Sequence, residues 1–137
     1  METDPTYTTD EARRLLPQVR GTLLQLAIER RRADDAHAAL HRHLRTADDG
    51  DAPNRAPNQT PNTNELEATT SELRARVRDL LDHLESLGVV VRDLDAGLVD
   101  IPTIRDGELA WLCWRLSDPE LAWWHTTSEG FSSRRPL

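Results

Sequence analysis

Residues 88–125 have the sequence GVVVRDLDAGLVDIPTIRDGELAWLCWRLSDPELAWWH, and this stretch decides the fold. It contains all four tryptophans and the only cysteine of the 137-residue chain. Short runs rich in β-branched and aromatic residues alternate with the turn-forming sequences DLDAG, PTIRDG and SDPE. This pattern predicts an antiparallel meander of four short strands, at residues 89–91, 98–101, 109–116 and 121–125.

The last two predicted strands allow a register to be proposed. With 117–120 as a four-residue loop, Trp114 lies opposite Trp123 and Cys113 opposite Trp124, and opposed residues share a face. One face is nearly all apolar and is expected to lie on helices: Ala110, Leu112, Trp114, Leu116, Leu121, Trp123 and His125. The second face, with Leu109, Trp111, Cys113, Arg115, Ala122 and Trp124, must be covered by the C-terminal tail, a second copy or a ligand. We take it as the candidate functional surface.

Helical sequence precedes the strands. YTTDE at 7–11 predicts a capping box and a short N-terminal helix, which Pro17 is expected to break or kink near Leu16. Apolar residues then recur every three or four positions from 16 to 44 and again from 66 to 87. This coiled-coil spacing predicts two long helices that form an antiparallel hairpin.

The proline- and asparagine-rich residues 46–64 are predicted to be a flexible linker between the two long helices. The expected architecture is therefore α+β, with a helical hairpin packed on a small four-stranded antiparallel sheet. Residues 1–137 are expected to form a single domain.

The composition of the chain indicates which partners and which cellular location to expect. The net charge of -7 opposes attraction to phosphate backbones, so we expect no nucleic-acid partner. One cysteine excludes an internal disulfide framework. The acidic N-terminus has no apolar run of signal length, and no later run approaches the length of a membrane span. We therefore expect a soluble cytoplasmic protein with no membrane partner.

Four motifs carry a resemblance to a known family: YTTDEARRLLP at 7–17, GVVVRDLDAGLVDIP at 88–102, LCWRLSDPELAWWH at 112–125 and GFSSRRPL at 130–137. In these motifs the chain resembles the bacterial and archaeal family called domain of unknown function 2203. Ile101 departs from the aromatic residue more common there, which implies different packing. The family has no established activity, so the resemblance directs attention to certain residues without giving them roles: Asp100, Trp114, Arg115, His125 and Phe131.

His125 and Cys113 are the residues with the most reactive side chains in the predicted sheet. His125 could be a metal ligand or a general base. A structural histidine bonded to a backbone carbonyl or a carboxylate is the interpretation that we favour. Cys113 is expected to be a small buried hydrophobic residue, because the predicted register puts His125, the base that a nucleophile would need, on the opposite face.

Charged residues around the strands also have two interpretations. Arg115 shares its predicted face with Trp111 and Trp124, where it could stack on an indole or bind a carboxylate or phosphate. An ion pair with Asp118, Glu120 or Glu129 is the alternative. The aspartates of DLDAG lack the glycine and glutamate positions of a calcium loop and are expected to form turns.

Phosphate-binding glycine loops and known hydrolase or metalloprotease motifs are absent from the sequence, and no cofactor is assigned. The leading hypothesis is a binding or interaction protein that forms a homo-oligomer, with a small-molecule ligand as a further candidate. The alternative is a metal-dependent or small-molecule enzyme with a site around His125, Arg115 and Asp100. The candidate ligand or interface residues are Asp100, Trp111, Trp114, Arg115, Trp124, His125 and Phe131.

Overall fold

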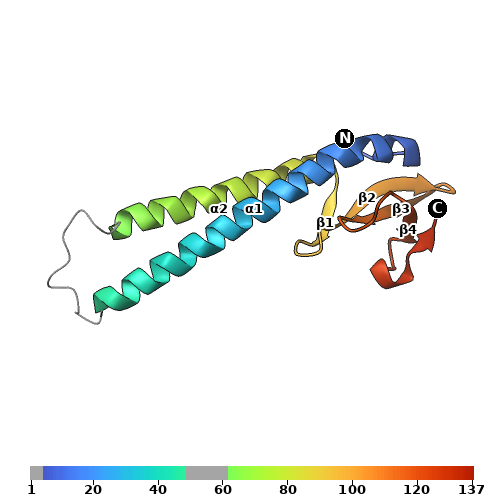
Figure 1. The fold of residues 1–137 in the computed structure, drawn as a ribbon. Coiled ribbons are helices and arrows are strands. Elements are labelled where there is room, and N and C mark those ends of the chain that lie inside the picture. The colour runs from blue at the N-terminus through green and yellow to red at the C-terminus, as the bar shows by residue number, and fades with distance from the viewer. Residues whose placement is uncertain (1–4, 49–61) are drawn as a thin grey trace. The chain divides into compact units, whose positions relative to one another are not determined.

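Two helices and a five-stranded sheet make up the structure, a computed structural model that describes residues 5–48 and 62–137 (Figure 1). Helix α1 spans Thr9–Asp48 and helix α2 spans Thr63–Ser86. The strands are β1 (Val90–Asp93), β2 (Leu98–Arg105), β3 (Glu108–Arg115), β4 (Trp123–Thr126) and β5 (Arg135–Pro136), with a short 3-10 helix, η1 (Phe131–Ser133), before β5. The predicted α+β class is confirmed.

The chain divides into two compact units. The sheet unit comprises Met1–Gln25 and Leu80–Leu137, and the hairpin unit comprises Leu26–Asp79. Each long helix contributes one part to each unit.

In the hairpin unit, polar contacts join α1 to α2. Arg74 Nη2 donates to His37 Nδ1 over 2.9 Å, and His43 Nε2 lies 3.0 Å from Thr63 Oγ1. Glu29 is buried and lies 3.9 Å from the guanidinium of Arg76. Glu29, near the middle of α1, lies beside Arg76, in the second half of α2, whereas His43, late in α1, lies beside Thr63 at the start of α2. The two helices therefore run antiparallel, and the predicted hairpin is confirmed.

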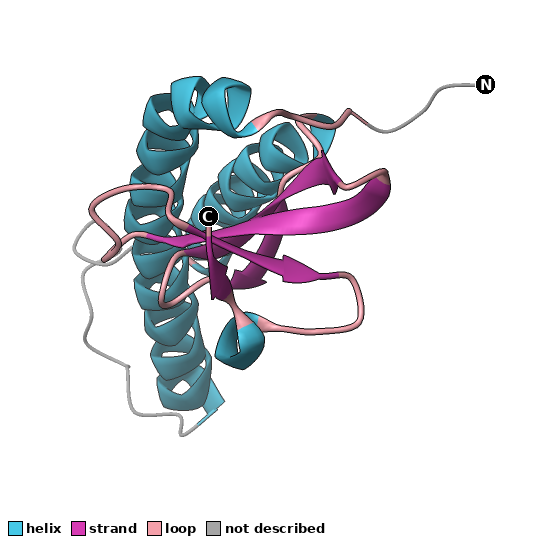
Figure 2. Cartoon of the chain, turned by 90° about the vertical axis from the view of Figure 1, so that its right-hand side faces the viewer, coloured by secondary structure: helices cyan, strands magenta, loops and turns pink. Residues whose placement is uncertain are grey.

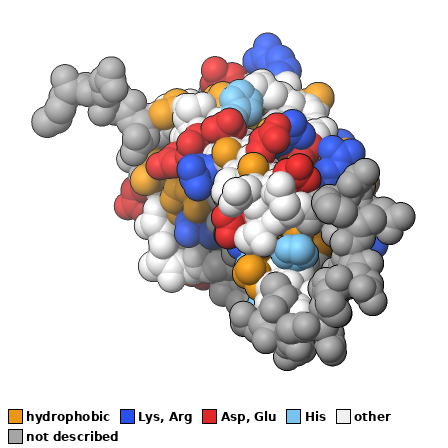
Figure 3. Space-filling model, turned by 90° about the vertical axis from the view of Figure 1, so that its left-hand side faces the viewer, with side chains coloured by type: hydrophobic (Ala, Val, Ile, Leu, Met, Phe, Trp, Pro, Cys, Tyr) orange, Lys and Arg blue, Asp and Glu red, His pale blue; other side chains and the backbone are white. Residues whose placement is uncertain are grey.

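The surface of the described residues mixes charges of both signs. Figure 3 shows arginine side chains interspersed with aspartate and glutamate on the face in view. On α2, Arg76 pairs with Glu72 at 2.9 Å, one helical turn away. Exposed pairs of this kind contribute little stability, and they keep the helix surface solvated.

The linker predicted at 46–64 falls mainly on residues 49–61, which lie outside the described residues. The first and last residues of the predicted linker are helical, because α1 continues to Asp48 and α2 begins at Thr63. Asn62 precedes α2 and its side-chain Oδ1 accepts from the Glu65 amide over 2.8 Å. This N-cap explains why the second helix starts inside the predicted linker.

The predicted capping box is present at the start of α1. Thr8 N donates to Glu11 Oε1 over 2.9 Å, and Glu11 N donates to Thr8 Oγ1 over 3.1 Å. Tyr7 ties this end to the sheet unit, because its amide donates to Pro102 O (2.8 Å) and its hydroxyl to Leu87 O (2.7 Å).

The separate short N-terminal helix is a prediction that needs correction. Helix α1 is continuous through Pro17, and its first turns run at an angle to the rest (Figure 2). A proline inside a helix removes one hydrogen bond and crowds the preceding turn, at a cost of ~3 kcal/mol. Ala12, Val19 and Leu23, on both sides of Pro17, are buried, and their burial offsets that cost. The interruption is thus a bend within one helix.

The sheet is an antiparallel meander with the strand order β1-β2-β3-β4-β5. Strand β2 extends four residues beyond its predicted end at 101, because the turn to β3 is made by Asp106 and Gly107 rather than at Pro102. Both turn residues have positive φ, 52° and 79°, as the tightest hairpin turns require. The tail adds the fifth strand, in which Arg135 pairs with Trp124.

The predicted register of the last hairpin is wrong by one residue. Cys113 lies opposite Trp123 and Trp111 opposite His125. The loop contains residues 116–122 instead of 117–120, because Asp118 closes a local turn: its amide donates to Arg115 O and its Oδ2 accepts from Arg115 N. A one-residue shift moves every side chain of β4 to the other face.

The corrected register divides the sheet into a helix-facing side and a side that we call the outer face. Arg20 of α1 lies over the Trp114 ring at 5.1 Å, which identifies the helix-facing side. That side is apolar and fully buried at its centre: Val99, Ile101, Ala110, Leu112 and Trp114. The outer face carries His125 and Trp123, which were expected on the helices, while Trp124 moves to the helix-facing side.

Candidate functional site

A hollow of about 320 Å³ opens on the outer face of the sheet. Its floor is made by strand residues, Asp100 from β2, Cys113 from β3 and His125 from β4. Its rim is made by the segment that follows β4, including Glu129 and Phe131. Arg92 of β1 also lines the hollow. The site is therefore built from four adjacent strands and the C-terminal tail.

His125 and Asp100 form a buried pair at this floor. His125 Nε2 lies 3.0 Å from Asp100 Oδ1, and the two side chains are 2% and 3% exposed. The other ring nitrogen, Nδ1, lies 2.8 Å from the backbone carbonyl of Thr126. The favoured sequence interpretation, a histidine bonded to a carbonyl or a carboxylate, describes both contacts.

The two contacts of the imidazole fix its orientation. A carbonyl oxygen only accepts, so Nδ1 is the donor to Thr126 O. Nε2 then faces the Asp100 carboxylate, so each of these buried polar groups has a partner.

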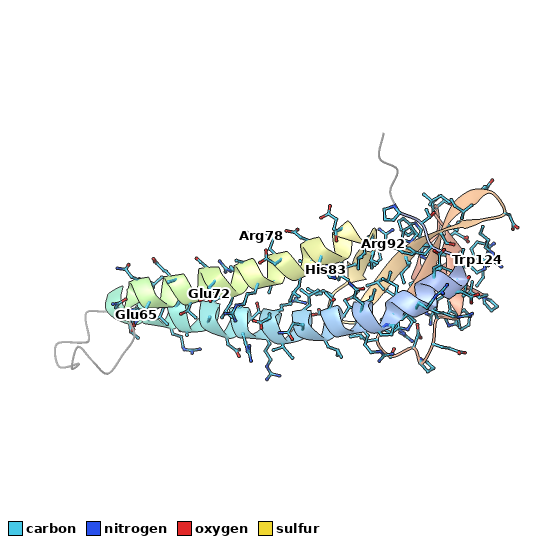
Figure 4. The ribbon with its side chains drawn as sticks, turned by 90° about the horizontal axis from the view of Figure 1, so that it is seen from above. Glu65, Glu72, Arg78, His83, Arg92 and Trp124 are labelled. Carbon is cyan, nitrogen blue, oxygen red and sulfur yellow. The ribbon has the colours of Figure 1, made fainter. Side chains whose placement is uncertain are left out.

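Arg92 completes the bonding of Asp100. Its Nε donates to Asp100 Oδ2 over 2.8 Å, and its guanidinium lies 5.2 Å from the centre of the Trp111 ring. Arg92 stands at a bulge of β1, between Val91 and Asp93. Figure 4 shows it beside the strands. Arg92 was not predicted from the sequence, although it lies inside the GVVVRD motif, because nothing in the spacing predicts the bulge.

Cys113 is 1% exposed and lies beside the same carboxylate. Burial, followed by the charge of Asp100, raises the pKa of the Cys113 thiol to about 11. Arg134 opposes part of this increase. Cys113 is thus a protonated thiol at neutral pH, and both nitrogens of His125 are already engaged. This is not the geometry of an activated nucleophile.

The C-terminal tail covers part of the outer face. The guanidinium of Arg134 lies 4.8 Å from the centre of the Trp123 ring and 4.2 Å from that of Phe131. Its Nη1 donates to Asp118 Oδ2 over 2.8 Å. Burial alone would raise the pKa of Asp118, but hydrogen bonds from Arg134 and the Arg115 amide outweigh it and hold that pKa below its usual value. Of the three covers proposed for this face, the tail is present.

Arg115 and Asp93 adopt the simpler of their predicted roles. Arg115 Nε lies 3.6 Å from Asp118 Oδ1, and the guanidinium lies over Phe131 at 4.9 Å. Asp93 Oδ1 accepts from the amides of Asp95 and Ala96, over 3.0 and 3.1 Å. Arg115 is therefore an ion-paired residue beside the hollow, and Asp93 forms a turn.

The tryptophans among the candidate residues are dispersed. Trp111 is on the outer face but lines a second groove, of about 430 Å³, together with Pro5 and Pro102. Trp114 is buried against Arg20. Trp124 is stacked with Arg105 at 4.4 Å, on the helix-facing side. Asp100, His125 and Phe131 are the candidates that the structure brings together at the hollow.

Comparisons with known proteins give one result. The chain matches the family model described as "Uncharacterized conserved protein (DUF2203)" over residues 5–137, so the predicted resemblance is confirmed over nearly the whole chain. No match is found among curated proteins or among solved structures. Within residues 5–48 and 62–137, neither helix is both long and apolar enough to cross a membrane.

Proposed function

This chain belongs to DUF2203, a family of uncharacterised conserved proteins, and we propose that it is a ligand-binding protein whose site is the hollow on the outer face of the sheet. The observation that carries the proposal is the buried polar floor formed by Asp100, Cys113 and His125. Apolar side chains could fill such a position without the desolvation cost of ionisable groups. Ionisable groups that instead face an open hollow are typical of binding sites.

The lining of the hollow indicates the kind of ligand. Arg92 supplies donors, Glu129 supplies acceptors, and the Phe131 ring supplies an apolar wall. The volume of about 320 Å³ is at the small end of known ligand pockets. We therefore infer an ion or a small polar molecule rather than a peptide or a large cofactor.

Native mass spectrometry of untagged protein tests this function. We expect the wild-type protein to retain a discrete ligand mass, and His125→Phe to lose it while remaining folded by circular dichroism. His83→Ala is the matched control, because His83 lies on α2 and is bonded to Gln18. A bare chain mass for the wild-type protein would contradict the proposal.

We also propose that the protein acts in the cytoplasm as a homo-oligomer, without nucleic acid, and that α1 supplies a coiled-coil contact. The net charge of -7 supports the absence of nucleic acid. Leu24 and Ile28, one helical turn apart on α1, are 50% and 48% exposed, which supports self-association. In sedimentation experiments, Leu24→Ser with Ile28→Ser should lower the mass. A single-chain mass for the wild-type protein at all concentrations would exclude self-association.

A further inference from the structure

We propose that the floor of the hollow binds one divalent transition-metal ion of the zinc class, with Asp100, Cys113 and His125 as its protein ligands. The inference rests on the proposed ligand-binding function and identifies the ligand. One ligand atom from each residue, a carboxylate oxygen, the thiol sulfur and a ring nitrogen, lies within 4.8 Å of the other two. All three side chains are buried.

The spacing of these atoms suits a metal of this class after small movements. Zinc bonds of ~2.0–2.3 Å in tetrahedral geometry place neighbouring ligand atoms roughly 3.3–3.6 Å apart. His125 Nε2 and Asp100 Oδ1 are now 3.0 Å apart, so they would separate by a few tenths of an ångström. The sulfur would approach by rotation about the Cα–Cβ bond of Cys113.

His125 is held in the orientation of a metal ligand. Its Nδ1 donates to Thr126 O over 2.8 Å, which directs Nε2 toward Asp100 and Cys113. Metal-binding histidines characteristically donate their second ring proton to a carbonyl or carboxylate, since this fixes the tautomer and the ring plane. Here the supporting carbonyl belongs to the next residue of the same strand.

The two oxygens of the Asp100 carboxylate also have different partners. Oδ2 accepts from Arg92 Nε over 2.8 Å, while Oδ1 faces His125. A metal bound through Oδ1 would leave the Arg92 bond intact. Arg92 is thus a positioning residue, which holds the carboxylate plane without touching the ion.

The ligand types select the metal. Thiolate and imidazole prefer zinc, cobalt and related ions, whereas calcium and magnesium prefer oxygen ligands throughout. Three protein ligands leave a fourth position of the tetrahedron, and the adjoining hollow is bordered by Glu129 and Phe131. An open fourth position of this kind takes water or a small ligand atom.

Titration of metal-free protein with Co²⁺ tests the site, because cobalt bound to thiolate gives a near-ultraviolet charge-transfer band. We expect one equivalent to bind the wild-type protein with this band. Cys113→Ser should remove the band, and His125→Ala should lower the affinity at least about tenfold. His83→Ala should match the wild type. Arg92→Met should weaken binding ~10–100-fold and keep the band, as expected of a residue that acts through Asp100.

Two results would overturn the metal site. One is folded wild-type protein that takes up neither Co²⁺ nor Zn²⁺; the other is a charge-transfer band that survives Cys113→Ser. If that wild-type protein still retains a small molecule in native mass spectrometry, the ligand-binding function stands without the metal. If it has a bare mass and takes up no metal, both proposals fail. The wild-type titration decides the question even if a variant does not fold.

Discussion

The centres of the two faces of the sheet are buried to the same degree by different means. On the helix-facing side, Trp114 and Ile101 are 0% exposed, and α1 lies on that side through Arg20. On the outer face, Cys113 and Asp100, the chain neighbours of those residues, are 1% and 2% exposed. Along β2 and β3, successive residues at the centre of the sheet thus alternate between a buried apolar face and a buried polar face. Burial alone therefore does not identify the core of this protein.

The two faces have different roles in the protein. Apolar burial on the helix-facing side contributes ~25 cal/mol per Å² and needs no partner atoms. Polar burial on the outer face adds little net stability and requires every donor and acceptor to be paired. Asp100 meets this requirement through Arg92 and His125. The first face specifies the fold, and the second holds reactive groups in place.

The largest effect is expected on the helix-facing side. Trp114→Ala removes a fully buried indole from the core, and we expect a loss of ~3–5 kcal/mol in the free energy of unfolding. Trp111→Ala is the matched variant on the outer face, where the ring is partly exposed, and its loss should be smaller. Denaturant unfolding of both variants measures the difference. Equal losses would mean that the two faces contribute alike.

On the outer face, the free energy of unfolding should depend on whether polar groups are paired rather than on the volume of the side chain removed. Asp100→Ala leaves Arg92 and His125 without their carboxylate, and we expect a loss of about 2–3 kcal/mol, moderated because Arg92 can reach water. Replacing both members of the pair, in Asp100→Leu with His125→Leu, should recover part of the loss. Denaturant unfolding checks that the wild type is the most stable, the double variant is intermediate and Asp100→Ala is the least stable. A double variant less stable than Asp100→Ala would show that the pair is not the source of the cost.

The smallest effect concerns the tail that covers the outer face, and it depends on pH. Hydrogen bonds hold the pKa of Asp118 below its ordinary value of 3.8. The carboxylate therefore stabilises the fold above that value, and its contribution, about 1–2 kcal/mol, is lost as the pH falls through the lower folded pKa. Thermal unfolding should be measured as the pH falls from above 3.8 through the lower folded pKa. Stability should fall more steeply for the wild type than for Asp118→Asn. Parallel curves would argue against the Arg134–Asp118 contact.

Much of the fold was predictable because it depends on local patterns. The Thr8–Glu11 capping box, the heptad spacing of the helices and the series of short strands joined by tight turns follow from residues close in sequence. Strand β5 was not predicted, because it contains only Arg135 and Pro136, too few residues to show alternation. Of the predicted break or kink near Pro17, the helix shows no break, because burial on both sides of the proline is a tertiary contribution.

The site was predicted in its residues but not in its arrangement. Asp100, His125 and Phe131 were named from the sequence, yet His125 was expected on the helix-facing side. One residue of register separates that prediction from a floor shared with Cys113, and the turn closed by Asp118 decides it. Arg92 was missed because it contacts Asp100 from a bulge.

Local sequence is sufficient to specify which segments become helix or strand, because hydrophobic period and turn residues act over a few positions. It also specifies a meander with two differently composed faces. Which groups meet on the outer face depends on tertiary packing, since a single shift between β3 and β4 exchanges the faces of every β4 residue. Asp100, Cys113 and His125 meet because three strands align them, and a periodicity of two cannot specify that alignment.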